Sequence, residues 1–141
     1  MKITLLEPLI IPGSVLEGYL DALRAAGHTV CAFDTRSTDP AELSRRIGDS
    51  DIAIIGNTPL PGEVIRGAKN LKLLNVAFTG IDHIDLAACR EMGVTVCNAA
   101  GYSTQCVAEL AVGLAIACLR FVPQCDTPAR TGGVGAPLRG R

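Results

Sequence analysis

Short apolar segments alternate with helical segments five times along this chain, and the alternation constrains its fold more than any other feature. The segments expected as strands are rich in Val, Ile and Leu, and they span 2–6, 29–33, 51–55, 71–78 and 94–97. The expected helices carry apolar residues at helical spacing, and they span 15–26, 39–47, 62–68, 85–92 and about 104–120. Because each helix returns the chain to the start of the next strand, the strands should pair in parallel.

This pattern predicts an α/β fold with an open, doubly wound sheet. Five strand and helix units favour the strand order 2-1-3-4-5, in which ligands bind beyond the carboxyl ends of the strands, near the switch between the first and third strands. The loops that would reach this edge of the sheet are 7–13, 56–61, 78–82 and 98–104.

Composition limits the partners and the compartment that we expect. A net charge of −1 offers no basic face for nucleic acid. The longest apolar run, 107–119, contains Glu109 and is shorter than a membrane span of about 20 residues. With no secretory signal and six cysteines without a CxxC pair, the chain should be cytoplasmic, with its thiols buried in the core. Few aromatic residues are present, so the core should be aliphatic.

The loop Phe78-Thr79-Gly80-Ile81-Asp82 has the strongest signal for a binding site. Gly80 would let a ligand approach the backbone closely, and successive N–H groups could then hold an anion. A plain turn that needs glycine for a positive φ, followed by a helix capped by Asp82 or Asp85, explains the same residues. Asn57 ends the third strand and is a weaker signal, since polar residues before a proline are ordinary turn chemistry.

No residue pattern indicates catalysis or metal binding. His83 adjoins Asp82, but neighbours at the start of a helix usually point apart, and no nucleophile motif accompanies them. No metal-ligand spacing is present in the sequence. Ser103 or Thr104 is an expected N-cap, although the N–H groups of such a helix start could also hold a phosphate or carboxylate.

The stretch from 71 to 120 closely resembles the D-isomer-specific 2-hydroxyacid dehydrogenases. The motifs that carry the resemblance are TGIDHIDL at 79–86, GVTV at 93–96, Asn98, GYST at 101–104 and VAEL at 107–110. The resemblance implies a flavodoxin-like substrate-binding domain at 1–101, an apolar crossing helix at 102–122, and a linker or tail at 123–141 that leads toward a nicotinamide-binding domain. It places the chain's end at the domain boundary, as in a truncated enzyme.

The resemblance also implies roles for particular residues. The substrate carboxylate would be held at Phe78, Thr79, Gly80 and Ile81, with Asn57 beside it, and Thr104 would approach the nicotinamide end of NAD or NADP. The family's Gly-rich cofactor fingerprint, substrate-binding Arg and Glu/His acid–base pair have no counterpart in this sequence. No residue is therefore assigned a catalytic role, and tight cofactor binding by this chain alone is not expected.

Two functions are compatible with these residues. The first is the substrate-binding part of an NAD(P)-dependent oxidoreductase that acts on the CH–OH group of a D-2-hydroxy acid by hydride transfer to nicotinamide. The second is a non-catalytic module that binds or senses a small carboxylate. The expected partners are a small 2-hydroxy or 2-keto carboxylate and a second copy of the chain, because the helix at 104–120 is apolar all round and needs a cover on both sides.

Overall fold

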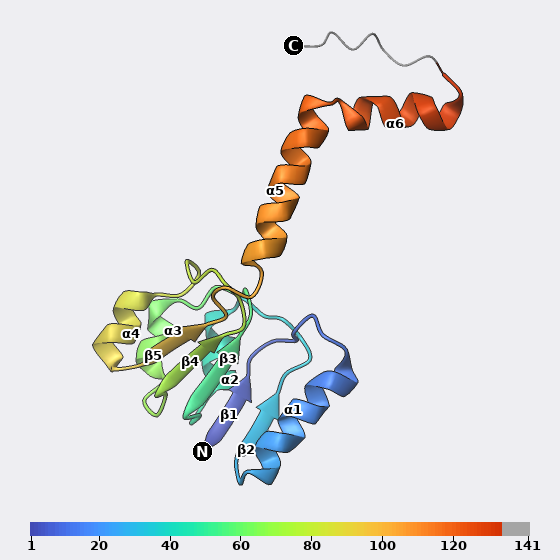
Figure 1. Ribbon diagram of the computed structural model, residues 1–141. Helices are drawn as coiled ribbons and strands as arrows, with labels where there is room; N and C mark the ends of the chain where they lie inside the picture. Colours follow the sequence, from blue (N-terminus) through green and yellow to red (C-terminus); the bar gives the residue numbers. More distant parts are fainter. Residues whose placement is uncertain (134–141) are drawn as a thin grey trace. The chain divides into compact units, whose positions relative to one another are not determined.

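The computed structural model describes residues 1–133 and divides into two compact units, Met1–Tyr102 and a second unit that begins at Ser103. The first unit contains a five-stranded parallel sheet with the order β2-β1-β3-β4-β5 (Figure 1). Its strands are β1 (Lys2–Leu5), β2 (Thr29–Ala32), β3 (Ile52–Ile55), β4 (Leu73–Val76) and β5 (Thr95–Asn98). The predicted α/β class and strand order are confirmed.

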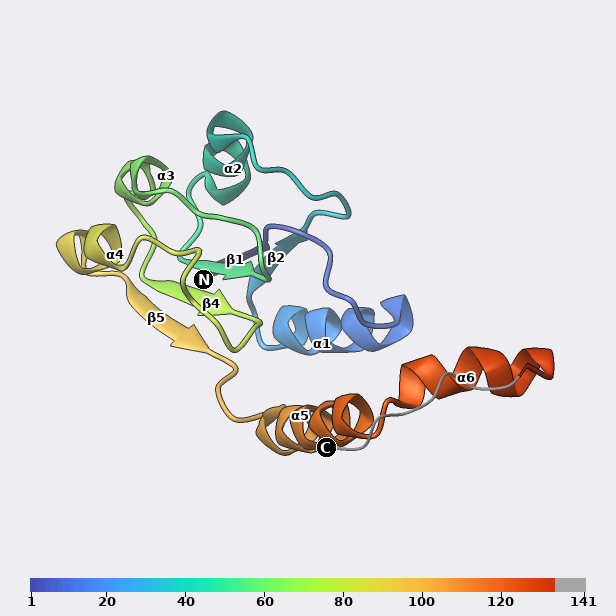
Figure 2. The ribbon, with the colours of Figure 1, turned by 90° about the horizontal axis from the view of Figure 1, so that it is seen from above.

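Helices lie on both faces of this sheet. Seen from above, α2 (Pro40–Ile47), α3 (Gly62–Gly67) and α4 (Leu86–Met92) lie along one face, and α1 (Gly13–Ala25) lies on the other (Figure 2). Local residues fix where these helices begin and end. Asp39 accepts a hydrogen bond from the backbone N of Ala41 at the start of α2, and Gly93 ends α4 in the left-handed conformation that favours glycine.

The core is aliphatic, as predicted, and lies between the sheet and helices α2–α4. Ala53 and Ile55 of β3 and Leu74 and Val76 of β4 are completely buried on this side. Successive strand residues point to opposite faces. Leu73, one residue before Leu74, points to the α1 side and is only partly buried. The α2–α4 face is therefore the better covered of the two.

The expectation that the cysteines are core residues is wrong for most of them. Cys89 of α4 is buried, but Cys31 and Cys97 are exposed. Their strands, β2 and β5, form the two edges of the sheet, and three of the four residues in each of them are exposed. Cys106 and Cys118, in the second unit, are also exposed.

The second unit consists of α5 (Thr104–Leu119) and α6 (Val122–Thr131), which meet at an angle of 66°. Of the two residues between them, Arg120 and Phe121, the second has a positive φ of 54°. Residues 123–131, which the resemblance placed in a linker or tail, are helical as part of α6, and Arg130 Nε and Asp126 Oδ1, one turn apart, form an ion pair of 2.8 Å there. The tail residues 134–141 lie outside the described residues.

No single helix among residues 1–133 is long and apolar enough to cross a membrane, although α5 and α6 meet the length and composition criteria when the bent pair is taken together.

Candidate functional site

A buried carboxylate joins the carboxyl ends of three strands. Glu7 follows β1, and its side chain is only 1% exposed. Its Oε1 accepts hydrogen bonds from the backbone N of Gly56 at 2.8 Å and of Thr58 at 2.9 Å, beyond β3. Its Oε2 accepts from Thr58 Oγ1 and from Nε of Arg36, which follows β2, each at 2.6 Å. Glu7 thus fixes the turn after β3 relative to β1 and β2.

The pKa of Glu7 reflects two opposing effects. Burial alone would raise the pKa, because the charged form loses its hydration. The hydrogen bonds from Thr58, Arg36 and Gly56 act in the opposite direction and leave the pKa below its ordinary value. Glu7 is therefore ionised at neutral pH, and its charge is balanced by Arg36.

Gly56 is required by the close approach of this carboxylate. A Cβ atom at position 56 would lie 3.1 Å from Glu7 Oε1, closer than side chains normally allow. Any larger residue would therefore require the Glu7 carboxylate or the turn to shift by a few tenths of an ångström. The φ of Gly56 is not positive, so the backbone conformation does not call for glycine here. The glycine instead allows the close contact with Glu7.

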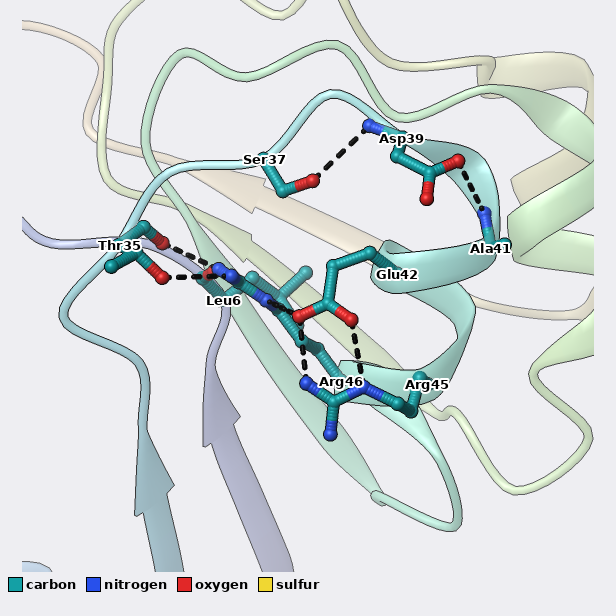
Figure 3. Close-up of polar contacts among 8 residues, drawn as sticks. All are labelled: Leu6, Thr35, Ser37, Asp39, Ala41, Glu42, Arg45 and Arg46. Carbon is teal, nitrogen blue, oxygen red and sulfur yellow. Dashed lines mark hydrogen bonds and ion pairs between the residues drawn. The ribbon is translucent and has the colours of Figure 1, made fainter.

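A second buried charge holds the loop that carries Arg36. Arg46 of α2 donates from Nη1 to the backbone O of Leu6 at 2.7 Å and from Nη2 to Thr35 Oγ1 at 2.9 Å (Figure 3). Its Nε donates to Glu42 Oε1 at 2.7 Å. These bonds tie the loop after β2 to the end of β1, and they place Arg36, the residue after Thr35, beside Glu7.

The turn after β4 is held by its carbonyl groups. Asn98 Nδ2 of β5 donates to the backbone O of Thr79 at 2.7 Å, and the backbone N of Ala99 donates to the O of Phe78 at 3.1 Å. His83 Nε2 lies 3.1 Å from the backbone O of Gly56. His83 therefore helps to link the turns after β3 and β4, which accounts for a histidine that the sequence left without a role.

The N–H groups of the same turn are free. Within residues 1–133, the backbone N atoms of Thr79, Gly80 and Ile81 have no hydrogen-bond acceptor from the protein. Gly80 does not have a positive φ, and a Cβ there would meet only Asp82 Oδ2, at 3.7 Å. Neither strain nor crowding explains this glycine, so the plain-turn interpretation loses its main argument. Asp85 caps α4 by accepting from the backbone N of Ala88 at 2.9 Å, as one of the two predicted caps.

A cavity of about 440 Å³ opens at this edge of the sheet. It is lined by Pro8, Leu9, Ile10, Ile11, Arg36, Gly56, Asn57, Ala77, Phe78, Ala99 and Tyr102. Two of the predicted substrate-binding residues, Asn57 and Phe78, meet in this lining, and Thr79, Gly80 and Ile81 follow Phe78 directly. Thr104 is the first residue of α5, in the second unit.

Sequence reasoning missed Glu7 and Arg36. A signal for Glu7 was present, because an acidic residue directly follows an apolar strand in a loop that reaches the predicted crevice. Arg36 carries no such signal. It lies 29 residues after Glu7 in the chain, and only the folded loop brings the two side chains together. Among the residues that the structure describes, no three His, Cys, Asp or Glu side chains are grouped as metal ligands would be.

The family comparison matches residues 10–132 to the catalytic domain of the D-isomer specific 2-hydroxyacid dehydrogenases. A D-3-phosphoglycerate dehydrogenase from Archaeoglobus fulgidus is 32% identical over the whole of this chain, which covers 27% of that relative. A hydroxypyruvate reductase from Blautia hydrogenotrophica is 35% identical over 71% of this chain and 34% of its own length. The chain therefore spans about a quarter to a third of the length of these relatives.

Solved structures agree with this assignment. An acyclic imino acid reductase in complex with NADPH and D-Arg has a TM-score of 0.81 and 28% identity over 98% of this chain and 43% of its own. An NAD-dependent formate dehydrogenase from Staphylococcus aureus, in complex with NAD, has a TM-score of 0.78 and 28% identity over 96% of this chain and 43% of its own. The fold is that of a dehydrogenase domain, and the chain belongs to the D-isomer specific 2-hydroxyacid dehydrogenase family.

The turn after β1 does not fit the pyrophosphate of a dinucleotide. In α/β folds that group sits on a glycine-rich turn whose N–H groups face it. The turn after β1 instead begins with the buried carboxylate of Glu7 and contains Pro8 and Pro12, which lack an N–H group. The turn after β1 is therefore not a pyrophosphate site of this kind.

Proposed function

We propose that this chain supplies the substrate-binding part of an NAD(P)-dependent oxidoreductase that acts on the CH–OH group of a D-2-hydroxy acid. The observation that carries the proposal is the row of free N–H groups at Thr79, Gly80 and Ile81, beside a cavity at the carboxyl ends of the strands. Family membership supports it. The alternative of a non-catalytic carboxylate-binding module is less well supported, because the relatives named above are enzymes.

The turn after β4 would hold the substrate carboxylate by its backbone. Consecutive N–H groups form a concave site for an anion without a cationic side chain. Gly80 would leave room for the carboxylate, and Asn57 and Phe78 would border the rest of the molecule. Nicotinamide, when bound, would accept a hydride from the 2-carbon of the acid or donate one to it. The residues of this chain would bind and orient the acid, and Thr104 would approach the cofactor.

Amide chemical shifts of the 141-residue chain, titrated with pyruvate or glyoxylate, test this site. We expect shifts at 78–81 and weak affinity. Gly80→Val should abolish them by filling the approach to the N–H groups, while the fold survives because the space at Gly80 is open. Gly18→Val, also in open space but on α1, is the matched control. Shifts that survive Gly80→Val, or that lie elsewhere, would refute the proposal.

Cofactor binding by this chain alone should be negligible. Since the turn after β1 does not fit a pyrophosphate and the sequence lacks the family's Gly-rich fingerprint, we expect calorimetric titration with NAD or NADP to show no tight binding, and we expect no turnover of hydroxy acids. The loss of general acid–base catalysis alone typically costs 10² to 10⁴ in rate. A micromolar dissociation constant for NAD would overturn this part of the proposal.

We further propose that the chain forms a homodimer through the helix at 104–120. Leu110, Val112, Leu114 and Ile116 are all more than half exposed, and among the described residues of its own unit the helix that α5 contacts is α6. Large apolar surfaces rarely stay uncovered in monomers. Leu114→Lys should shift light scattering toward a monomer, whereas Gln105→Lys, a polar position on α5, should not. A monomeric parent chain at tens of micromolar would contradict the dimer. The cytoplasmic location stays a prediction.

A further inference from the structure

We propose that the cavity at the carboxyl ends of the strands receives the substrate's side chain and selects one that is bulky, apolar and uncharged. The substrate class is then a 2-oxo or 2-hydroxy acid with a branched aliphatic or aromatic side chain. This inference rests on the proposed function and deepens it, because it names the group attached to the 2-carbon.

The walls of the cavity are largely hydrocarbon. Leu9 and Ile11 contribute from the β1–α1 loop, and Ala77 and Phe78 contribute from the end of β4. Ile11 is 40% exposed and Phe78 is 41% exposed, so both still have surface that a ligand can cover. Removing apolar surface from water is favourable. An alkyl or aryl group therefore gains more in this cavity than a hydroxyl or a hydrogen does.

The cation that lines the cavity is already paired. Arg36 Nε donates to Glu7 Oε2 at 2.6 Å, and the Glu7 side chain is almost fully buried. Arg36 is half-exposed and its Nη groups can still meet an anion, but its charge is already balanced by Glu7. A phosphate or second carboxylate would therefore lose hydration against the apolar walls without meeting an uncompensated cation. The cavity therefore disfavours acids with a second negative charge.

The position and size of the cavity agree with this role. Phe78 lines it and directly precedes the free N–H groups of Thr79, Gly80 and Ile81. An acid whose carboxylate binds these groups has the substituents of its 2-carbon close to Phe78. The volume of about 440 Å³ lies in the usual range of small-molecule sites, roughly 300–1,000 Å³. A three-carbon acid would leave most of this space empty.

Titrations of the 141-residue chain with 4-methyl-2-oxopentanoate, pyruvate and 3-phosphoglycerate test the proposal by amide shifts at 78–81. Each buried methylene is worth about fourfold in affinity, so we expect the branched acid to bind at least about tenfold more tightly than pyruvate. 3-Phosphoglycerate should bind no more tightly than pyruvate. Ile11→Ser should weaken the branched acid about fivefold and leave pyruvate unchanged. Val15→Ser, an exposed apolar position outside the cavity lining, is the matched control.

The outcomes distinguish a failure of this inference from a failure of the proposed function on which it rests. Equal affinity for the branched acid and pyruvate, or loss of both in Ile11→Ser, would overturn the side-chain assignment and leave the carboxylate site standing. Tighter binding of 3-phosphoglycerate would overturn it in favour of an anionic side chain held by Arg36. If none of the acids shifts residues 78–81, the proposed function fails and this inference fails with it.

Discussion

The two faces of the sheet are built from the same four-residue strands, but they are covered differently. On the α2–α4 face, Ile55, Leu74 and Val76 are completely buried. On the α1 face, Leu73 is partly buried and Asn75 is exposed. Of the helices in Met1–Tyr102, α1 alone lies on this second face, and it packs against β2 at one edge of the sheet.

The difference shows where the stability of the first unit resides. Fully buried apolar side chains contribute both transfer and packing energy, whereas partly exposed ones contribute a fraction of it. The polar contacts of the candidate site lie at the carboxyl ends of the strands, so they add to a framework that the α2–α4 face already holds. Exposed loop residues can therefore vary in sequence with less effect on stability than residues of the closed face.

Truncating adjacent leucines on the two faces should give the largest contrast. We expect Leu74→Ala to lower the free energy of unfolding by about 2–5 kcal/mol, because it leaves a cavity in a closed core. Leu73→Ala should cost less than about 1.5 kcal/mol, since its surroundings are already partly open. Urea denaturation of both variants measures the difference. Equal losses would mean that the two faces are equally well packed.

The second-largest expected contrast between the two faces is in the reactivity of their cysteine thiols. Cys89 is buried on the closed face, and burial, reinforced by the nearby Asp85, raises the pKa of its thiol. Because the thiolate is the reactive form, Cys89 should react only when the domain opens. We expect it to react at least about a hundredfold more slowly than the exposed Cys97, with labelling located by mass spectrometry. Similar rates at the two sites would show that the closed face opens readily.

Removing the charge of Glu7 tests how much the polar contacts at the carboxyl ends of the strands add to the stability of the closed core. Hydrogen bonds to a charged group contribute about 1.5–3 kcal/mol, so Glu7→Gln should lower the free energy of unfolding by about this amount. Glu17→Gln, an exposed position paired with Arg24 at 3.2 Å, should change it by less than about 1 kcal/mol.

The pH dependence has a definite sign. The pKa of Glu7 is lower in the folded chain than its ordinary value of 4.5, so the unfolded state takes up a proton first as the pH falls. The stabilisation from Glu7 is complete above that value and is lost as the pH falls through the folded pKa. Denaturation between pH 7 and pH 3 should therefore show a smaller acid-induced loss in Glu7→Gln than in the parent chain. An unchanged acid response would exclude Glu7 as its source.

The sequence predicted local structure better than contacts between distant segments. The strand order followed from alternation alone, and α2 followed from Asp39 and Pro40 at its start. The continuation of α6 was missed because Pro128 lies inside it and the surrounding residues are rich in Gly and Pro. Hydropathy could not place Cys97 on an exposed edge strand, since edge and central strands have similar composition.

The candidate site was predicted only in part, because some of its contacts join residues that are far apart in the sequence. Phe78 and Asn57 were predicted because each follows a strand that ends at the predicted crevice, and both line the cavity, although their binding role stays a prediction. The pairing of Glu7 with Arg36 joins residues far apart in the chain, and it depends on Arg46 holding the intervening loop. Such a contact requires the fold before it can be inferred.

The smallest expected effect concerns how helices on the two faces begin. Asp39 caps α2 on the closed face with a hydrogen bond of 3.2 Å from the backbone N of Ala41, whereas Pro12 begins α1 without a side-chain cap. Asp39→Ala should therefore cost about 1 kcal/mol of unfolding free energy, the usual value of an N-cap. Ser14→Ala, in the first turn of α1, should cost less than about 0.5 kcal/mol, because that side chain caps nothing. Thermal denaturation of the two variants measures both effects. A larger loss from Ser14→Ala would mean that the start of α1 depends on side-chain contacts at Ser14, and the contrast between the faces would not extend to their helix starts.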